Sequence, residues 1–442
     1  MLEKKEYKGY FYTPENPDKK ISGILYFYPN EKIRLELIGS CLSGSQVAHG
    51  LFCEHKEIET IFGVVKTDRG VSNVTLLHCY GSRSRSVDKS QNCKICLVNY
   101  SCHYLLIGKH LADRDDKVFN KIGVSFPCFS DWYRDNGIQE EDSKDICTRI
   151  FKITNSQKNP RKFQLNETET LIINGYSDTY NTNRYDRCLY EKSYIALEST
   201  EKSKLLDLLF NIGWFKDFYS FTAMTAMPFS EIYLYDNDDV EDGVRYPNPV
   251  QLFFVSEEKF EKRDKHLHNF LFSFKEIENN FGTIMQKWYE HKENSEPIIQ
   301  HLIYSVTYRK TIKNSDFLFV IQAIEGYYRR FEEYTSLENI LKKLYCKYAD
   351  IQIIANNTTD IDQVVASRNY YSHLCLSHEK QKENVCKGWD LFGLAEKLKP
   401  LLICCILTLI GFENKEIDKL LSKHYMWSGN SFLTTSSLKH SI

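Results

Sequence analysis

The stretch that decides how the C-terminal part of the chain folds is TTDIDQVVASRNYYSHLCLSHE, residues 358–379. Asp360 followed by Gln363 has the spacing of a capping box, in which two side chains satisfy free backbone N–H groups at the start of a helix. Apolar residues then recur at helical spacing, at Ile361, Val364, Val365 and Tyr371. The pattern predicts an amphipathic helix that begins at about residue 361.

Three polar residues of this helix are candidates for chemistry. On an ideal helix Arg368 falls on the apolar stripe, and Asn369 and His373 form an i,i+4 pair beside it. Arg368 and His373 then stand about 140° apart around the helix axis. Because burying a permanent cation costs several kcal/mol unless it is paired, Arg368 requires a partner.

Composition indicates a folded protein with two or three domains. The chain has 442 residues, of which 42% are hydrophobic and 26% charged. A net charge of −2 and a pI near 6.7 argue against a basic surface for nonspecific nucleic-acid binding, so any contact with RNA must be local. The aromatic share of 14% predicts aromatic-rich cores.

The sequence suggests neither a secretory signal nor a membrane span. The first twenty residues are polar, and the longest apolar run, LLICCILTLIGF from Leu401 to Phe412, is shorter than the roughly 20 residues that cross a bilayer. The 14 cysteines are typical of reduced thiols rather than of a disulfide framework. We expect a cytoplasmic protein in which residues 401–412 form a buried helix.

Residues 10–195 have the pattern of β-strands. Short apolar or alternating runs are separated by Gly, Asn, Asp and Ser turns, in KISGILYFYP, KIRLELIG, IETIFGVVK, VSNVTLLHCY, KICLVNY, HYLLIGKHL, KIGVSFPCF and ETLIINGY. The pattern predicts a mostly antiparallel sandwich or barrel. GSRSRS, residues 81–86, is expected to be a solvated hairpin loop, with phosphate contact through Arg83 and Arg85 as the alternative.

Helical patterns dominate after about residue 196, interrupted by a strand pair in EIYLYDN and PVQLFFV. We expect one helix in SKLLDLLFNIGWFKDFYSFTAM and another in FLFSFKEIENNFGTIMQKWYEHKEN that ends before Pro297. Four helices should follow, and Pro400 should kink the last of them or mark its start. The predicted fold is α+β, with a β-rich sandwich- or barrel-like domain at residues 1–295 and an all-α bundle at residues 296–442.

The first of those four helices carries a candidate partner for Arg368. In NSDFLFVIQAIEGYYRRFEEY, the apolar stripe has Glu325 at its edge and Arg329 one turn further along, and the stripe consists of Phe317, Ile321, Ile324, Tyr328 and Phe331. A buried carboxylate near a buried arginine is the expected arrangement of an ion pair.

A second candidate site lies in the β-rich half. Cys93 and Cys96 have the spacing of a zinc knuckle, and His78 and Cys79 could complete a structural zinc site. The alternative is that these cysteines alternate in and out of a strand's core face.

The segment RNYYSH resembles the RNxxxH signature of the HEPN family, helical domains that include metal-independent ribonucleases. QAIEGYYRR is similar to the family's helix that carries a glutamate ahead of the signature. The runs ISGILYFYPNEKIRLELIG, TLLHCYG, YLLIGKH and KIGVSFPCFSDWY resemble the N-terminal domain of the ApeA family of anti-phage effectors. The resemblance implies a sensor or regulatory N-terminal domain and a C-terminal ribonuclease that cuts host RNA, with tRNA as the expected target, when a phage component triggers it.

Cleaving RNA without a metal requires a base for the ribose 2′-OH, a cation for the phosphorane and an acid for the leaving 5′-oxygen. His373 suits proton transfer near neutral pH, and the planar guanidinium of Arg368 suits phosphate oxygens. Asn369 could orient His373 or bind phosphate, and Glu325 could balance Arg368 or fix the imidazole tautomer. We expect a 2′,3′-cyclic phosphate and a 5′-hydroxyl as products, with no catalytic cofactor.

One histidine is few for two proton transfers, and the resemblance implies a homodimer in which the two signature helices face each other. Other functions remain open. Arg368 and Glu325 could form a purely structural ion pair in a non-catalytic HEPN dimer that binds a nucleotide, RNA or a protein partner. The β-rich half could also be a carbohydrate- or protein-binding module with a helical appendage.

Overall fold

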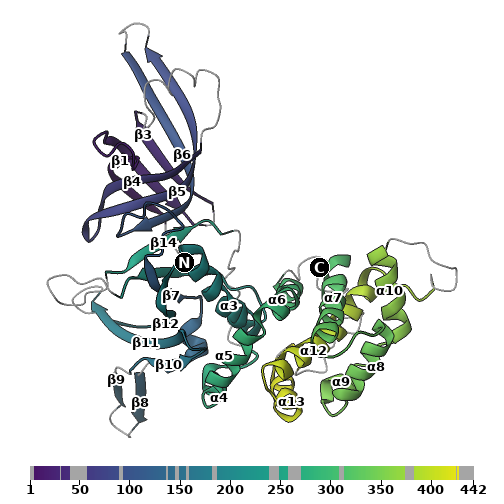
Figure 1. Ribbon diagram of the computed structural model, residues 1–442. Coiled ribbons are helices and arrows are strands. Elements are labelled where there is room, and N and C mark those ends of the chain that lie inside the picture. The colour runs from purple at the N-terminus through teal and green to yellow at the C-terminus, as the bar shows by residue number, and fades with distance from the viewer. Residues whose placement is uncertain are drawn as a thin grey trace. The chain divides into compact units, whose positions relative to one another are not determined.

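The computed structural model describes residues 4–29, 31–39, 57–88, 93–135, 138–144, 149–155, 159–181, 187–237, 248–256, 270–307, 313–373, 383–424 and 426–427. The chain divides into two compact units. One consists of Met1–Phe129, Asn136–Gly213 and Pro228–Glu261, and the other of Ser130–Asp135, Trp214–Met227 and Lys262–Ile442. The first unit is built on strands and the second on helices, so the fold is α+β as predicted (Figure 1). The division at residues 295 and 296 stays a prediction.

Six strands of the first unit close into a barrel. They are β1 (Lys5–Tyr12), β2 (Ile21–Tyr28), β3 (Lys32–Ile38), β4 (Glu57–Thr67), β5 (Gly70–Asp88) and β6 (Cys93–Ile107). Antiparallel pairing runs from β1 through β2, β3, β6, β5 and β4 back to β1. Apolar and polar residues alternate in KIRLELI, so the side chains of Ile33, Leu35 and Leu37 of β3 all lie in the barrel core. Gly63 of β4 faces that core, where an added Cβ would lie 2.6 Å from the ring of Phe11.

The sheet continues beyond the barrel through β6, whose residues 104–107 pair with β14 (Val250–Phe254). From β14 the order is β13 (Glu231–Tyr235), β7 (Phe119–Ser125), β12 (Arg187–Ser203), β11 (Glu169–Asn181) and β10 (Arg161–Gln164). A separate hairpin joins β8 (Ile138–Lys144) to β9 (Arg149–Asn155). The predicted strand pair at EIYLYDN and PVQLFFV is confirmed, because β13 and β14 are antiparallel neighbours.

Two expectations about the strands are wrong. GSRSRS, residues 81–86, is not a hairpin loop, because its backbone belongs to β5 and pairs with β6 from Gly81 opposite Tyr100 to Ser86 opposite Ile95. KICLVNY and HYLLIGKHL do not form separate strands, because KICLVNY and the first five residues of HYLLIGKHL both lie in β6. In each case pairing with a long neighbour extends a strand through residues that lack strict alternation.

The described helices include the predicted ones in the predicted order, with different ends, together with helices that the sequence pattern does not predict. The described helices are α2 (Phe129–Tyr133), α3 (Leu205–Ala223), α4 (Phe274–Ile277), α5 (Phe281–Glu290), α6 (Lys292–Thr307), α7 (Asn314–Phe331), α8 (Leu337–Lys347), α9 (Gln352–Asn356), α10 (Ile361–His373), α12 (Gly388–Leu409) and α13 (Asn414–Lys423). The helix expected before Pro297 is divided into α4 and α5, and Pro297 lies inside α6. Pro400 does not mark the start of its helix, because α12 begins at Gly388.

Residues 401–409 of the apolar run expected to be a buried helix form the end of α12, and the last three residues of the run lie beyond it. Every residue from 401 to 407 is buried, and α12 packs against α6 and α7. Lys399, one residue before Pro400, is also buried, and its ammonium donates to the carbonyl of Ser305 at 2.9 Å. No helix in the described ranges is long and apolar enough to cross a membrane.

The second unit has an aromatic core, as the composition predicts. Trp214 of α3 and Trp288 of α5 stack with ring centroids 4.7 Å apart. Each indole N–H donates to the backbone carbonyl of the other tryptophan, at 2.8 Å from Trp214 and 3.0 Å from Trp288. Because both polar N–H groups find a partner, the two large rings are buried without an unsatisfied donor.

Burial predicts the order in which thiols react. Burial raises the pKa of the Cys405 thiol from its ordinary 9.0 to about 12, and it also raises the pKa of neighbouring Cys404. At pH 8 the thiolate fraction of Cys405 should therefore fall about a thousandfold below that of an ordinary cysteine. Iodoacetamide should alkylate exposed Cys346 first and reach Cys404 and Cys405 only after unfolding, as peptide mass spectrometry can measure. Equal labelling of all three in the native protein would contradict the burial of α12.

Candidate active site

The helix α7 presents Glu325 from a largely apolar face. Phe317, Ile321, Ile324 and Tyr328 of the predicted stripe are buried, whereas Phe331 is half-buried. Glu325 is only 5% exposed, although its side chain is ionisable. A carboxylate at this depth requires positive partners.

The helix α10 is held by its N-terminal cap and by hydrogen bonds to the backbone of Cys386. Asp360 accepts hydrogen bonds from the backbone N–H groups of Asp362 at 3.0 Å and of Gln363 at 3.5 Å, which is the Asp360 half of the predicted capping box. Ser367 is fully buried, and its hydroxyl accepts the backbone N–H of Cys386 at 2.9 Å. The hydroxyl of Tyr371 donates to the carbonyl of Cys386 at 3.1 Å, and burial raises the pKa of Tyr371 and of the Cys386 thiol. These contacts fix the rotation of α10 around its axis.

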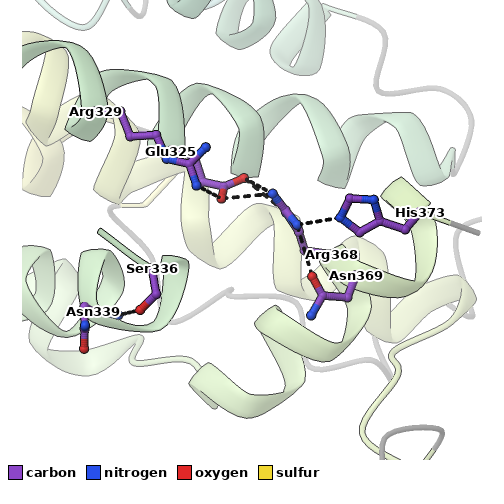
Figure 2. A network of polar contacts seen from close by, with 7 residues as sticks. All are labelled: Glu325, Arg329, Ser336, Asn339, Arg368, Asn369 and His373. Atoms are coloured by element: carbon purple, nitrogen blue, oxygen red, sulfur yellow. Dashed lines mark hydrogen bonds and ion pairs between the residues drawn. The ribbon is translucent and has the colours of Figure 1, made fainter. Parts of the chain in front are cut away.

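Arg368 joins the two helices through a two-pronged ion pair. Its Nε and Nη2 donate to the two oxygens of Glu325, at 3.2 Å each (Figure 2). The Arg368 side chain is 21% exposed and the Glu325 side chain 6%. Parallel N–H···O bonds of this kind fix the plane of the guanidinium as well as its position.

The remaining nitrogen of Arg368 faces the other two signature residues. Nη1 lies 3.1 Å from Asn369 Oδ1 and 3.0 Å from His373 Nε2. A guanidinium nitrogen can only donate, so Nε2 of His373 must be the acceptor in this contact. This contact assigns the ring proton of the imidazole to Nδ1. The unprotonated nitrogen adjoins a cation that is suited to phosphate.

The structure brings together all four candidate catalytic residues, Glu325, Arg368, Asn369 and His373. On an ideal helix Arg368 and His373 stand about 140° apart. The long side chain of Arg368 nevertheless reaches His373 and contacts it directly. The structure also adds Arg329, whose Nη2 donates to Glu325 Oε1 at 3.0 Å (Figure 2). The i,i+4 spacing of Glu325 and Arg329 is the sequence signal for this second pair.

The candidate zinc ligands are not brought together by the strand register. Cys79 pairs with Cys102 of β6, six residues beyond Cys96, which corresponds to about 20 Å along a strand. His78 lies instead beside Arg114, whose Nη1 donates to His78 Nε2 at 2.7 Å. The side chains of Cys93 and Cys96 lie outside the described residues, but the backbone is strand through both positions, without the turn of a zinc knuckle. Zinc at this pair stays a prediction, which elemental analysis of the purified protein tests.

The helical bundle with its glutamate, arginine, asparagine and histidine network has the character of an HEPN domain, a class whose members are commonly ribonucleases. The Apea-like HEPN model matches residues 318–416, which include the whole network. The ApeA N-terminal domain 1 model matches residues 6–288, more than half of the chain. The chain therefore belongs to the ApeA family of anti-phage HEPN effectors. Comparisons with curated proteins and with solved structures gave no match.

The geometry predicts that loss of Glu325 costs more stability than loss of Arg329. Glu325→Gln leaves Arg368 and Arg329 together without a countercharge, so it should lower the free energy of unfolding by about 1–3 kcal/mol. Arg329→Gln should cost less than about 1 kcal/mol, because Arg329 is partly exposed and Glu325 keeps Arg368. Urea denaturation followed by tryptophan fluorescence measures both, since Trp214 and Trp288 lie in the same unit. Equal effects would mean that Glu325 and Arg368 are not the dominant pair.

Proposed function

We propose that the protein is a metal-independent endoribonuclease of abortive-infection defence, which cuts host RNA at the Arg368 and His373 site. The observation that carries the proposal is the contact between Arg368 Nη1 and His373 Nε2 at 3.0 Å. In this contact a permanent cation lies next to an imidazole nitrogen that carries no proton. These are the two groups that transesterification at a ribose phosphate needs.

In the proposed reaction, phosphate oxygens replace His373 and Asn369 as acceptors of the Arg368 Nη1 hydrogens. His373 Nε2 is then free to take the proton of the 2′-OH. The 2′-oxygen attacks phosphorus, the bond to the 5′-oxygen breaks, and that oxygen takes a proton from an imidazolium. The products are a 2′,3′-cyclic phosphate and a 5′-hydroxyl. Glu325 keeps the guanidinium in place throughout, through the Nε and Nη2 contacts.

A homodimer would supply the second imidazole. His373 lies at the end of α10 and is exposed, so it is accessible to a second chain. One His373 would act as the base and the partner's as the acid. We further propose that the protein acts in the cytoplasm, that tRNA is the substrate, and that a phage component acts through the N-terminal half.

Substitution of the two central residues tests the proposal. In EDTA, His373→Ala and Arg368→Ala should each lower cleavage of total tRNA by about 10²- to 10⁴-fold, because each removes one required group. The measurement compares purified full-length proteins, with and without lysate from phage-infected cells, and maps the chemistry of the fragment ends.

Two matched variants control for the loss of a histidine or an arginine from the same unit. His301→Ala removes a half-buried histidine of α6. Arg330→Ala removes an arginine that follows Arg329 in the chain and whose guanidinium donates to the carbonyl of Asn294. Both should cleave like the wild type. Cleavage by His373→Ala at the wild-type rate would refute the assigned role. No cleavage by any protein, together with intact binding of RNA, would favour the non-catalytic HEPN dimer.

A further inference from the structure

Tyr334 lies just beyond the end of α7 and is the most exposed large hydrophobic side chain in the described part of the chain, at 84%. The guanidinium of Arg329 lies over its ring, 5.0 Å from the ring centroid. This cation–π contact holds the ring from one side and leaves most of its surface in solvent.

Direct contacts connect Tyr334 to the candidate active site. Arg329, which covers the tyrosine ring, also donates to Glu325 at 3.0 Å. Glu325 in turn holds Arg368, and Arg368 contacts His373. Figure 2 shows Arg329 and His373 at opposite ends of this row, with Glu325 and Arg368 between them. A ligand whose charged group lies at Arg368 and His373 could therefore extend along the row toward the tyrosine.

The charges beside Tyr334 do not oppose a polyanion. Glu332 and Glu333 precede it in the chain, but both carboxylates are paired with lysines of α8. Glu332 lies 2.6 Å from Lys347, and Glu333 contacts Lys343. Arg329 and Arg368 share the one carboxylate of Glu325, so these three side chains together keep an excess of positive charge.

We propose that Tyr334 and Arg329 form a base-stacking subsite for an unpaired nucleotide near the scissile phosphate. Arg329 would contact the RNA backbone, and the exposed ring face would stack on the base. Aromatic side chains that bind RNA stack chiefly on bases that have left a duplex, so the substrate class that we propose is RNA with an unpaired loop. This inference rests on the proposed ribonuclease function and defines which part of an RNA the site selects.

The test separates stacking from chemistry with the full-length protein. On an RNA hairpin with a cleavable loop, Tyr334→Ala should raise KM between about fivefold and about a hundredfold, with the loss in KM rather than in kcat. Tyr334→Trp should restore the wild-type KM, because it keeps an aromatic face. Tyr10→Ala is the matched control, since Tyr10 is 55% exposed and lies in the other unit.

Abasic substitutions in the loop identify the stacked nucleotide. Removing that base should weaken cleavage by the wild type and add no further loss to Tyr334→Ala. An unchanged KM in Tyr334→Ala, or an equal abasic penalty in both proteins, would overturn the inference while leaving the ribonuclease proposal intact.

Binding of the same hairpin, measured by fluorescence anisotropy in a His373→Ala background, does not depend on catalysis. Adding Tyr334→Ala should weaken this binding by a similar factor, and equal affinities would overturn the inference. If wild-type protein cleaves nothing but Tyr334 still contributes to binding, the subsite stands and the ribonuclease proposal fails.

Discussion

The arrangement of α7 and α10 depends on one half-buried cation that cannot lose its charge. The Arg368 side chain is 21% exposed, and a guanidinium remains protonated at any physiological pH. A carboxylate must therefore accompany it, and Glu325 provides one from α7. Because both oxygens of Glu325 are used, the plane of the guanidinium is set, and this directs Nη1 toward Asn369 and His373. The same pair thus stabilises the bundle and orients the candidate catalytic groups.

Much of this site could be predicted from the sequence, because helical periodicity and a capping residue locate α7, α10 and their polar positions. The direct contact between Arg368 and His373 could not, since ideal angles around a helix ignore the reach of a long side chain. The sequence also does not predict that Ser367 is buried. Its hydroxyl is satisfied by the backbone N–H of Cys386, nineteen residues away. Tertiary hydrogen bonds of this kind leave no periodic signal in the sequence.

The sequence predicts strands where apolar and polar residues alternate. It does not predict strands that form only because their backbone pairs with a neighbouring strand. KIRLELI alternates and became β3, whereas GSRSRS does not alternate and still belongs to β5. Its backbone groups are satisfied by β6, so the neighbour and not the local sequence decides its conformation. Closure of the barrel has the same origin, because the pairing of β6 with β3 and of β4 with β1 joins residues that are distant in sequence.

That closure also determines how the β-rich unit can meet other chains. A strand with an unpaired side is a template for adding a foreign strand, and closing a sheet on itself removes such templates. Among the described strands of the twelve-stranded sheet, the last at one end is β10, which is four residues long, begins with Arg161 and Lys162, and pairs with residues 170–173 of the longer β11. A short, charged edge is a poor nucleus for aggregation.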